Sequence, residues 1–178
     1  MDPEGNKQLT TKFFDEVWTN GNVDYIDVAY APNFVLHAMW LNPSLGRSGD
    51  ASGPQQAKEI IARWHEALPD LKVTVEEQVA QGDTVVTRHW SSGTHLKEFQ
   101  GIKPTGTTAS FSGITITRIE GDKMVEAWTC WDGLGMLQAF GVIPKNLKLM
   151  AWAQRLGIVK LLQKLGRIPS PPKQPSQA

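Results

Sequence analysis

The spacing of the apolar residues changes once along the chain, at Pro69, and this change constrains the fold more than any other feature. Before Pro69 apolar residues recur mainly at helical spacing, as in Leu9, Phe13 and Val17. After it, apolar and polar residues alternate as in half-buried strands. Helices that precede a run of antiparallel strands are typical of an α+β fold, whereas alternating βαβ units build parallel sheets.

The pattern predicts three helices, at 9–20, at 23–29 and from the cap residue Ser52 to Pro69. It predicts a short strand at 34–37 and a loop at 42–53, which is rich in Gly, Ser, Asn and Pro. Further strands are expected at 71–75, 84–91, 109–119 and 124–132, and Gly113 is expected to mark a bulge or bend in its strand.

Composition excludes several classes of protein. The chain has 178 residues and a formal net charge of zero, which argues against a nucleic-acid-binding domain. Its single cysteine, Cys130, allows no internal disulfide and fits a reducing compartment. We find no signal peptide and no spanning segment, so the sequence predicts a cytoplasmic protein. Seven tryptophans indicate either an aromatic-lined cavity or interface, or an aromatic core.

The charge is distributed unevenly, because seven basic residues and no acidic residue follow Asp132. We therefore divide the chain into a main α+β domain at 1–143, a basic amphipathic helical extension at 144–166 and a disordered, proline-rich tail at 167–178. We expect the extension to pack on its own acidic body or on a dimer mate. Weak contact with a membrane surface and binding to another protein are the alternatives.

Several short motifs between Gly53 and Gly141 resemble the SnoaL-like polyketide cyclase family in their order and spacing: Ala67-Leu68-Pro69-Asp70-Leu71, Gly82-Asp83-Thr84-Val85-Val86, Gly93-Thr94-His95, Phe99-Gln100-Gly101-Ile102, Pro104-Thr105-Gly106, Lys123-Met124-Val125-Glu126-Ala127-Trp128 and Asp132-Gly133-Leu134-Gly135. The resemblance implies a cone-shaped barrel of the nuclear transport factor 2-like superfamily. In that fold a curved antiparallel sheet wraps around N-terminal helices and leaves a deep apolar pocket. It also implies a homodimer that pairs through the outer face of the sheet.

Family members close a polyketide ring by an intramolecular aldol step, without a metal or an organic cofactor. The resemblance places their catalytic Asp at Thr129 and its partner His at Thr115. Because a threonine cannot act as a base at neutral pH, these residues argue against the aldol mechanism. Thr115 and Thr129 are expected to be hydrogen-bond donors in the pocket.

The acid/base candidates are therefore His95, His37 and Asp132. An imidazole titrates near neutral pH, and a carboxylate beside an apolar pocket has a raised pKa. Each residue also has a structural interpretation, which for Asp132 is a helix cap. The candidate substrate-binding residues are Met39, Trp40, Trp90, Phe111, Thr115, Trp128 and Thr129. The four histidines lack metal-ligand spacing, so no metal site is expected.

Three functions remain open at this point. The first is a cofactor-independent cyclase, isomerase or lyase that acts on a hydrophobic, oxygenated small molecule by proton transfer. The second is a binding protein that keeps the pocket and has lost catalysis. The third is an interaction module that uses the basic helix. For the first two we expect a pocket of about 300–1,000 Å³ between sheet and helices, lined by His37 or His95.

Overall fold

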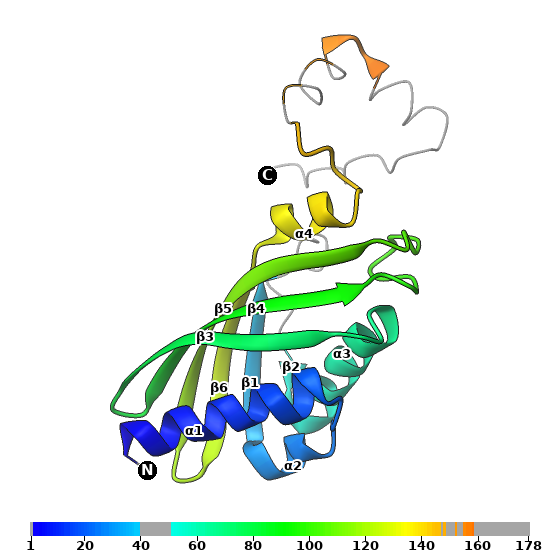
Figure 1. The fold of residues 1–178 in the computed structure, drawn as a ribbon. Coiled ribbons are helices and arrows are strands. Elements are labelled where there is room, and N and C mark those ends of the chain that lie inside the picture. The colour runs from blue at the N-terminus through cyan, green and yellow to red at the C-terminus, as the bar shows by residue number, and fades with distance from the viewer. Residues whose placement is uncertain (1, 40–50, 147, 149–151, 153–154, 159–178) are drawn as a thin grey trace, which may run out of the picture. The chain divides into compact units, whose positions relative to one another are not determined.

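The computed structural model describes residues 2–39, 51–146, 148, 152 and 155–158 (Figure 1). The chain divides into two compact units, Met1–Gly141 and Val142–Ala178. Most of the expected basic extension, all of the expected tail and most of the expected 42–53 loop lie outside the described residues. No helix in the described part is long and apolar enough to cross a membrane.

The first unit holds a six-stranded sheet in the order β2-β1-β6-β5-β4-β3. Its strands are β1 (Tyr30–Met39), β2 (Ala51–Ser52), β3 (Lys72–Gln81), β4 (Thr84–Thr94), β5 (Thr108–Glu120) and β6 (Lys123–Trp131). The pairs are antiparallel except β1 with β6, which run parallel. The parallel pair corrects the expectation of a wholly antiparallel sheet.

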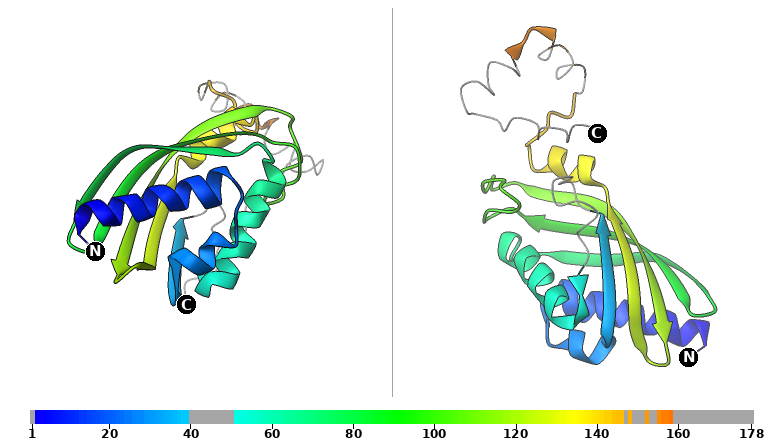
Figure 2. Two further views of the ribbon diagram at one scale, coloured as in Figure 1. Left: turned by 60° about the horizontal axis from the view of Figure 1, so that its bottom comes forward. Right: turned by 180° about the vertical axis from the view of Figure 1, so that it is seen from behind.

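The helices of this unit are α1 (Pro3–Phe13), a π-helical continuation η1 (Phe14–Thr19), α2 (Tyr25–Ala29), α3 (Gly53–Ala67) and α4 (Gly133–Ala139). The sheet curves around α1, α2 and α3, which lie on its concave side (Figure 2). Its edge strands β2 and β3 do not pair with each other, so the barrel is open. The α+β prediction is confirmed.

Local sequence explains where the helices begin. The Asp2 carboxylate accepts a hydrogen bond of 2.7 Å from the backbone N–H of Gly5, and Pro3 occupies the first turn of α1, where a missing N–H has no cost. At the other end of this helical segment, the Thr19 hydroxyl bonds to the backbone of Val73 in β3. The first helix is therefore tied to the edge of the sheet.

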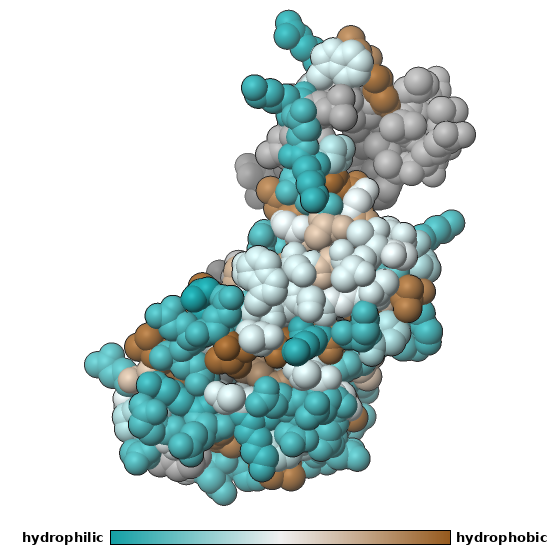
Figure 3. Space-filling view, in the orientation of Figure 1, coloured by the Kyte–Doolittle hydropathy of each residue, from teal (hydrophilic) through white to brown (hydrophobic). Residues whose placement is uncertain are grey.

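Alternation along the strands separates an inner from an outer face of the sheet. On the inner face an aromatic cluster fills the core, with ring centroids of Trp64 and Trp131 5.4 Å apart and those of Phe111 and Trp131 5.5 Å apart. Around α1 the surface is mainly hydrophilic, with hydrophobic residues showing between polar ones (Figure 3). The outer face carries exposed apolar side chains, namely Trp90, Ile114, Ile116 and Trp128.

The turn between α3 and β3 is held to the end of β4 by one carboxylate. Asp70 accepts hydrogen bonds from the backbone N–H of Thr94, at 2.6 Å, and from its hydroxyl, at 2.7 Å. These bonds favour the ionised form and lower the pKa of Asp70 below its ordinary value of 3.8.

We predict that Asp70→Asn destabilises the protein by about 1 kcal/mol at pH 7, at the low end for charged hydrogen bonds because the carboxylate is exposed. A group with a lowered folded-state pKa stabilises the fold above its unfolded pKa. The difference between the two proteins should therefore shrink as pH falls below 3.8. Urea unfolding at pH 7 and pH 3 measures it, with Asp122→Asn in another turn as the control. An equal difference at both pH values would contradict this account.

Candidate functional site

A cavity lies between the inner face of the sheet and the helices α1, η1 and α3. Its volume is about 30 Å³, which is room for about two water molecules. The expected range of about 300–1,000 Å³ is therefore wrong for this structure. The wall is mostly apolar and is formed by Thr10, Phe13, Phe14, Trp18, Tyr30, Leu36, Ile60, Ile61, Thr115, Thr117, Met124, Ala127, Thr129 and Trp131.

The hydroxyl groups in this wall belong to four threonines and one tyrosine. Thr115 and Thr129 are register partners on β5 and β6, so their side chains lie side by side on the inner face. The hydroxyl of Thr10 is engaged elsewhere, because it donates to the backbone of α1 and accepts from Gln78. Burial raises the pKa of Tyr30, so its phenol keeps its proton.

A buried histidine lies next to the threonine pair on the inner face of the sheet. Nε2 of His89, on β4, lies 3.2 Å from Oγ1 of Thr115, which in turn lies 3.1 Å from Oγ1 of Thr129. We call these three residues the His89 chain. It links a fully buried imidazole to the cavity through two hydroxyls.

Aromatic packing and a glycine hold the imidazole of His89 in place. Its ring centroid lies 4.9 Å from that of Phe14 and 4.8 Å from that of Trp131. Gly113 faces it on β5, and a Cβ there would come within 2.5 Å of Cε1 of His89. Gly113 therefore allows close packing of this ring. The pairing of β5 has no register shift at this position, so the expected bulge is not found there. Burial lowers the pKa of His89 to about 4, so the ring is neutral at pH 7.

His95 does not line the cavity. It follows the end of β4, where it is fully buried and stacks on Phe140 with ring centroids 4.6 Å apart. Its Nδ1 lies 3.3 Å from the hydroxyl of Thr105. Burial lowers the pKa of His95. His37 lies on the outer face of the sheet, as described below. Neither His37 nor His95 is therefore in the cavity wall, and the prediction that one of them lines the pocket is wrong.

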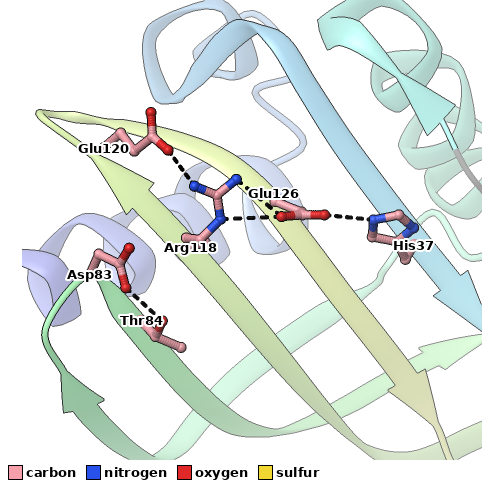
Figure 4. Close-up of polar contacts among 6 residues, drawn as sticks. All are labelled: His37, Asp83, Thr84, Arg118, Glu120 and Glu126. Atoms are coloured by element: carbon pink, nitrogen blue, oxygen red, sulfur yellow. Dashed lines mark hydrogen bonds and ion pairs between the residues drawn. The ribbon is translucent and has the colours of Figure 1, made fainter.

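His37 belongs to a row of charged residues on the outer face (Figure 4). Its Nε2 lies 3.0 Å from Oε1 of Glu126. The other carboxylate oxygen, Oε2, accepts hydrogen bonds of 3.1 and 3.2 Å from Arg118. The bonds from His37 and Arg118 lower the pKa of Glu126. The ring of His37 stacks on Trp128, with centroids 5.2 Å apart. The arrangement is a surface network, separated from the cavity by the sheet.

Asp132 is the N-cap of α4, where its exposed carboxylate accepts a hydrogen bond of 2.9 Å from the N–H of Gly135. Of its two interpretations, the structure shows the cap. Phe111 is buried in the core, and Trp90 and Trp128 are exposed on the outer face. The side chains of Met39 and Trp40 lie outside what the structure describes. In the described part, no three His, Cys, Asp or Glu residues form a group that could hold a metal ion.

Of the expected substrate-binding residues that the structure describes, only Thr115 and Thr129 lie in the cavity wall. His89, which bonds to Thr115, was not among the expected site residues. The alternation of inward- and outward-facing residues along β4 could have identified it, because His89 shares the inner face of that strand with Thr87 and Ser91.

We predict that Gly113→Ala lowers the free energy of unfolding by roughly 1–3 kcal/mol, because the new methyl group collides with His89 and Trp131. It should also shift the imidazole resonances of His89. Urea unfolding and histidine side-chain NMR measure the two effects. Ser112→Ala, one residue away and facing outward, should change neither. An unshifted His89 signal in a destabilised Gly113→Ala protein would refute the packing role.

Comparison with solved structures gives the same fold. A candidate SnoaL-like polyketide cyclase from Jannaschia sp. CCS1 is 24% identical, with a TM-score of 0.69 over 80% of this chain and 95% of its own. TsrD from Streptomyces laurentii is 25% identical, with a TM-score of 0.68 over 80% and 99%. IdmH from Streptomyces antibioticus, a candidate polyketide cyclase, is 26% identical, with a TM-score of 0.64 over 76% and 98%.

No curated protein matches the sequence. The profile of one family, described as SnoaL-like polyketide cyclase, matches residues 8–140. That range spans the helices, the sheet and the cavity of the first unit. It confirms the resemblance seen in the motifs, and the chain therefore belongs to the SnoaL-like polyketide cyclase family.

Proposed function

We propose that the protein is a cofactor-independent enzyme that acts on a hydrophobic, oxygenated small molecule by acid/base proton transfer, as a cyclase, isomerase or lyase. The observation that carries this proposal is the His89 chain, a pair of hydroxyls in an apolar cavity wall with an imidazole behind them. Family membership supports a cyclase-type reaction.

The chemistry follows from what the cavity wall offers. A ketone oxygen that accepts a hydrogen bond from Thr129 makes the neighbouring C–H bond more acidic, and solvent water takes the proton because none of the described residues of the wall carries a base. As that proton leaves, negative charge grows on the oxygen, and a hydrogen bond in an apolar, water-poor site stabilises this charge more than it stabilises the ketone. The hydroxyl pair thus supplies the hydrogen-bond donor that stabilises the enolate oxygen.

A second candidate function is a binding protein without catalysis. One observation favours it: none of the fourteen described residues that line the cavity carries a carboxylate or an imidazole. Such a wall binds an oxygenated molecule without taking a proton from it. Binding and proton exchange must therefore be measured separately.

The size of the cavity guides the choice of probe. A volume of about 30 Å³ means that any organic ligand displaces side chains of the wall. A bicyclic ketone demands less rearrangement than a polycyclic one. We choose 1-tetralone, which has exchangeable hydrogens beside its carbonyl, and tetralin, which has the same rings without oxygen.

We predict that the protein accelerates hydrogen–deuterium exchange beside the carbonyl of 1-tetralone in D₂O, measured by ¹H NMR. Thr129→Val should reduce the exchange rate by roughly 10²-fold or more, the usual loss for one donor to a developing oxyanion. Thr74→Val, which removes a hydroxyl on the exposed side of β3, is the matched control and should keep the rate. Binding of 1-tetralone without accelerated exchange would reject the enzyme in favour of the binding protein.

We also propose that the protein is a homodimer paired through the outer face of the sheet. Ile116 and Trp128 are register partners there, Ile114 lies on the same face of the same strand, and all three are at least 38% exposed. Contiguous exposed apolar side chains of this kind mark interaction surfaces, and a second copy presents the same apolar surface in return.

We predict that the wild-type protein sediments as a dimer and that Ile114→Lys sediments as a monomer, because the substitution buries an unpaired charge. Val28→Lys, at an exposed apolar residue of α2 away from the outer face of the sheet, is the control and should remain dimeric. A monomeric wild-type protein at high micromolar concentration would refute the proposal.

A further inference from the structure

The hydrogen bonds of the His89 chain have a direction, which decides what the cavity offers a ligand. A neutral imidazole has one N–H donor and one acceptor nitrogen, and each threonine hydroxyl has a single hydrogen to donate. Two arrangements give both bonds the same direction, from Thr129 inward to His89 or from His89 outward to Thr129, and in a third Thr115 accepts from both neighbours. In the first and third cases Thr129 presents an oxygen acceptor to the cavity, and in the second it presents an O–H donor.

We infer that the chain runs outward from Nε2 of His89, so that Thr129 offers a hydrogen-bond donor to the cavity and the site selects ligands through a carbonyl oxygen. This deepens the proposed function and rests on it for the location of the ligand.

The other nitrogen of the ring supports this direction. Nδ1 of His89 is buried and has no hydrogen-bond partner among the described residues. Buried N–H groups without a partner are rarer in proteins than acceptors with unused lone pairs. The proton is therefore better placed on Nε2, where Thr115 accepts it, than on Nδ1, where nothing does.

The remaining step concerns the bond between the two threonines. Once Thr115 accepts from His89, its own hydrogen is free to bond to Thr129, and this arrangement is favoured over the one in which Thr129 donates to Thr115 because aligned hydrogen bonds strengthen one another. The hydrogen of Thr129 is then left for the cavity, whose wall this residue forms. Bonds that point the same way polarise one another, which strengthens the final donor. His89 is thus a positioning residue, which acts on the ligand through two hydroxyls.

The direction also sets the chemical class of the ligand. A ketone or ester carbonyl accepts from Thr129 and needs no donor of its own. A hydrocarbon of the same shape leaves the hydroxyl of Thr129 unpaired in an apolar cavity, which disfavours its binding. The structure therefore assigns carbonyl compounds to this site in preference to hydrocarbons of equal size.

The first test is the tautomer of His89 in the full-length wild-type protein. Long-range ¹H–¹⁵N NMR on protein labelled with ¹⁵N-histidine distinguishes the two ring nitrogens, and the spectrum of His89→Gln assigns the signals among the four histidines. We expect a neutral ring protonated on Nε2 at pH 7. A proton on Nδ1 would overturn the inference, and this readout needs neither ligand nor turnover.

The second test compares 1-tetralone with tetralin by equilibrium binding, followed through tryptophan fluorescence because Trp18 and Trp131 line the cavity. We expect the wild-type protein to prefer the ketone by roughly tenfold, the value of one good hydrogen bond. Thr129→Val should abolish this preference. Thr129→Ser, which keeps the hydroxyl, and Thr74→Val, on the exposed side of β3, should retain it.

A ketone preference that survives in Thr129→Val, or that is absent from the wild-type protein, would overturn the inference. The outcome is separable from that of the proposed enzyme. If the preference holds and no hydrogen exchange is catalysed, only the enzyme is rejected. If exchange is catalysed while the preference is unchanged in Thr129→Val, only the direction of the His89 chain is rejected.

Discussion

The cavity depends on the register in which β4, β5 and β6 pair. Thr115 lies opposite Thr129, and His89 lies opposite Gly113, the one residue type that leaves room for its ring. A slip of one residue would turn the threonines to the outer face and close that space. The two-residue turn before β6, where Gly121 has a positive φ of 63°, pairs Glu120 with Lys123. A one-residue shift between Arg118 and Ile119 then brings Thr115 opposite Thr129.

Local patterns predicted the elements well, because helical and strand periodicities are properties of neighbouring residues. The parallel pairing of β1 with β6 could not be read in the same way, since it joins segments about ninety positions apart. The histidines show the same limit. His89 and His95 share strand parity, but the chain leaves the sheet after Thr94, so only His89 stays beside the cavity. Which of them contacts the threonine pair is a tertiary property.

The site differs from the family pattern at the two positions to which the resemblance assigns acid/base residues. The family resemblance places an imidazole at the position of Thr115. In this protein the imidazole of His89, on the neighbouring strand β4, contacts the hydroxyl of Thr115 instead. Because His89 is buried among aromatic rings, it is neutral, and the wall presents dipoles where the resemblance places a carboxylate. Dipoles stabilise a developing charge without the desolvation that a buried charge requires.

The pairing of β1 with β6 also bears on how the chain folds. β1 is made early in synthesis, yet its only long partner strand ends at Trp131. Contacts between distant segments slow folding, because the intervening loop must be ordered before the pairing stabilises it. Until β6 emerges, the apolar residues of β1, such as Phe34 and Leu36, can be covered only by the helices beside them. Because α3 packs against β1 in the finished fold, it is the element suited to shield these residues.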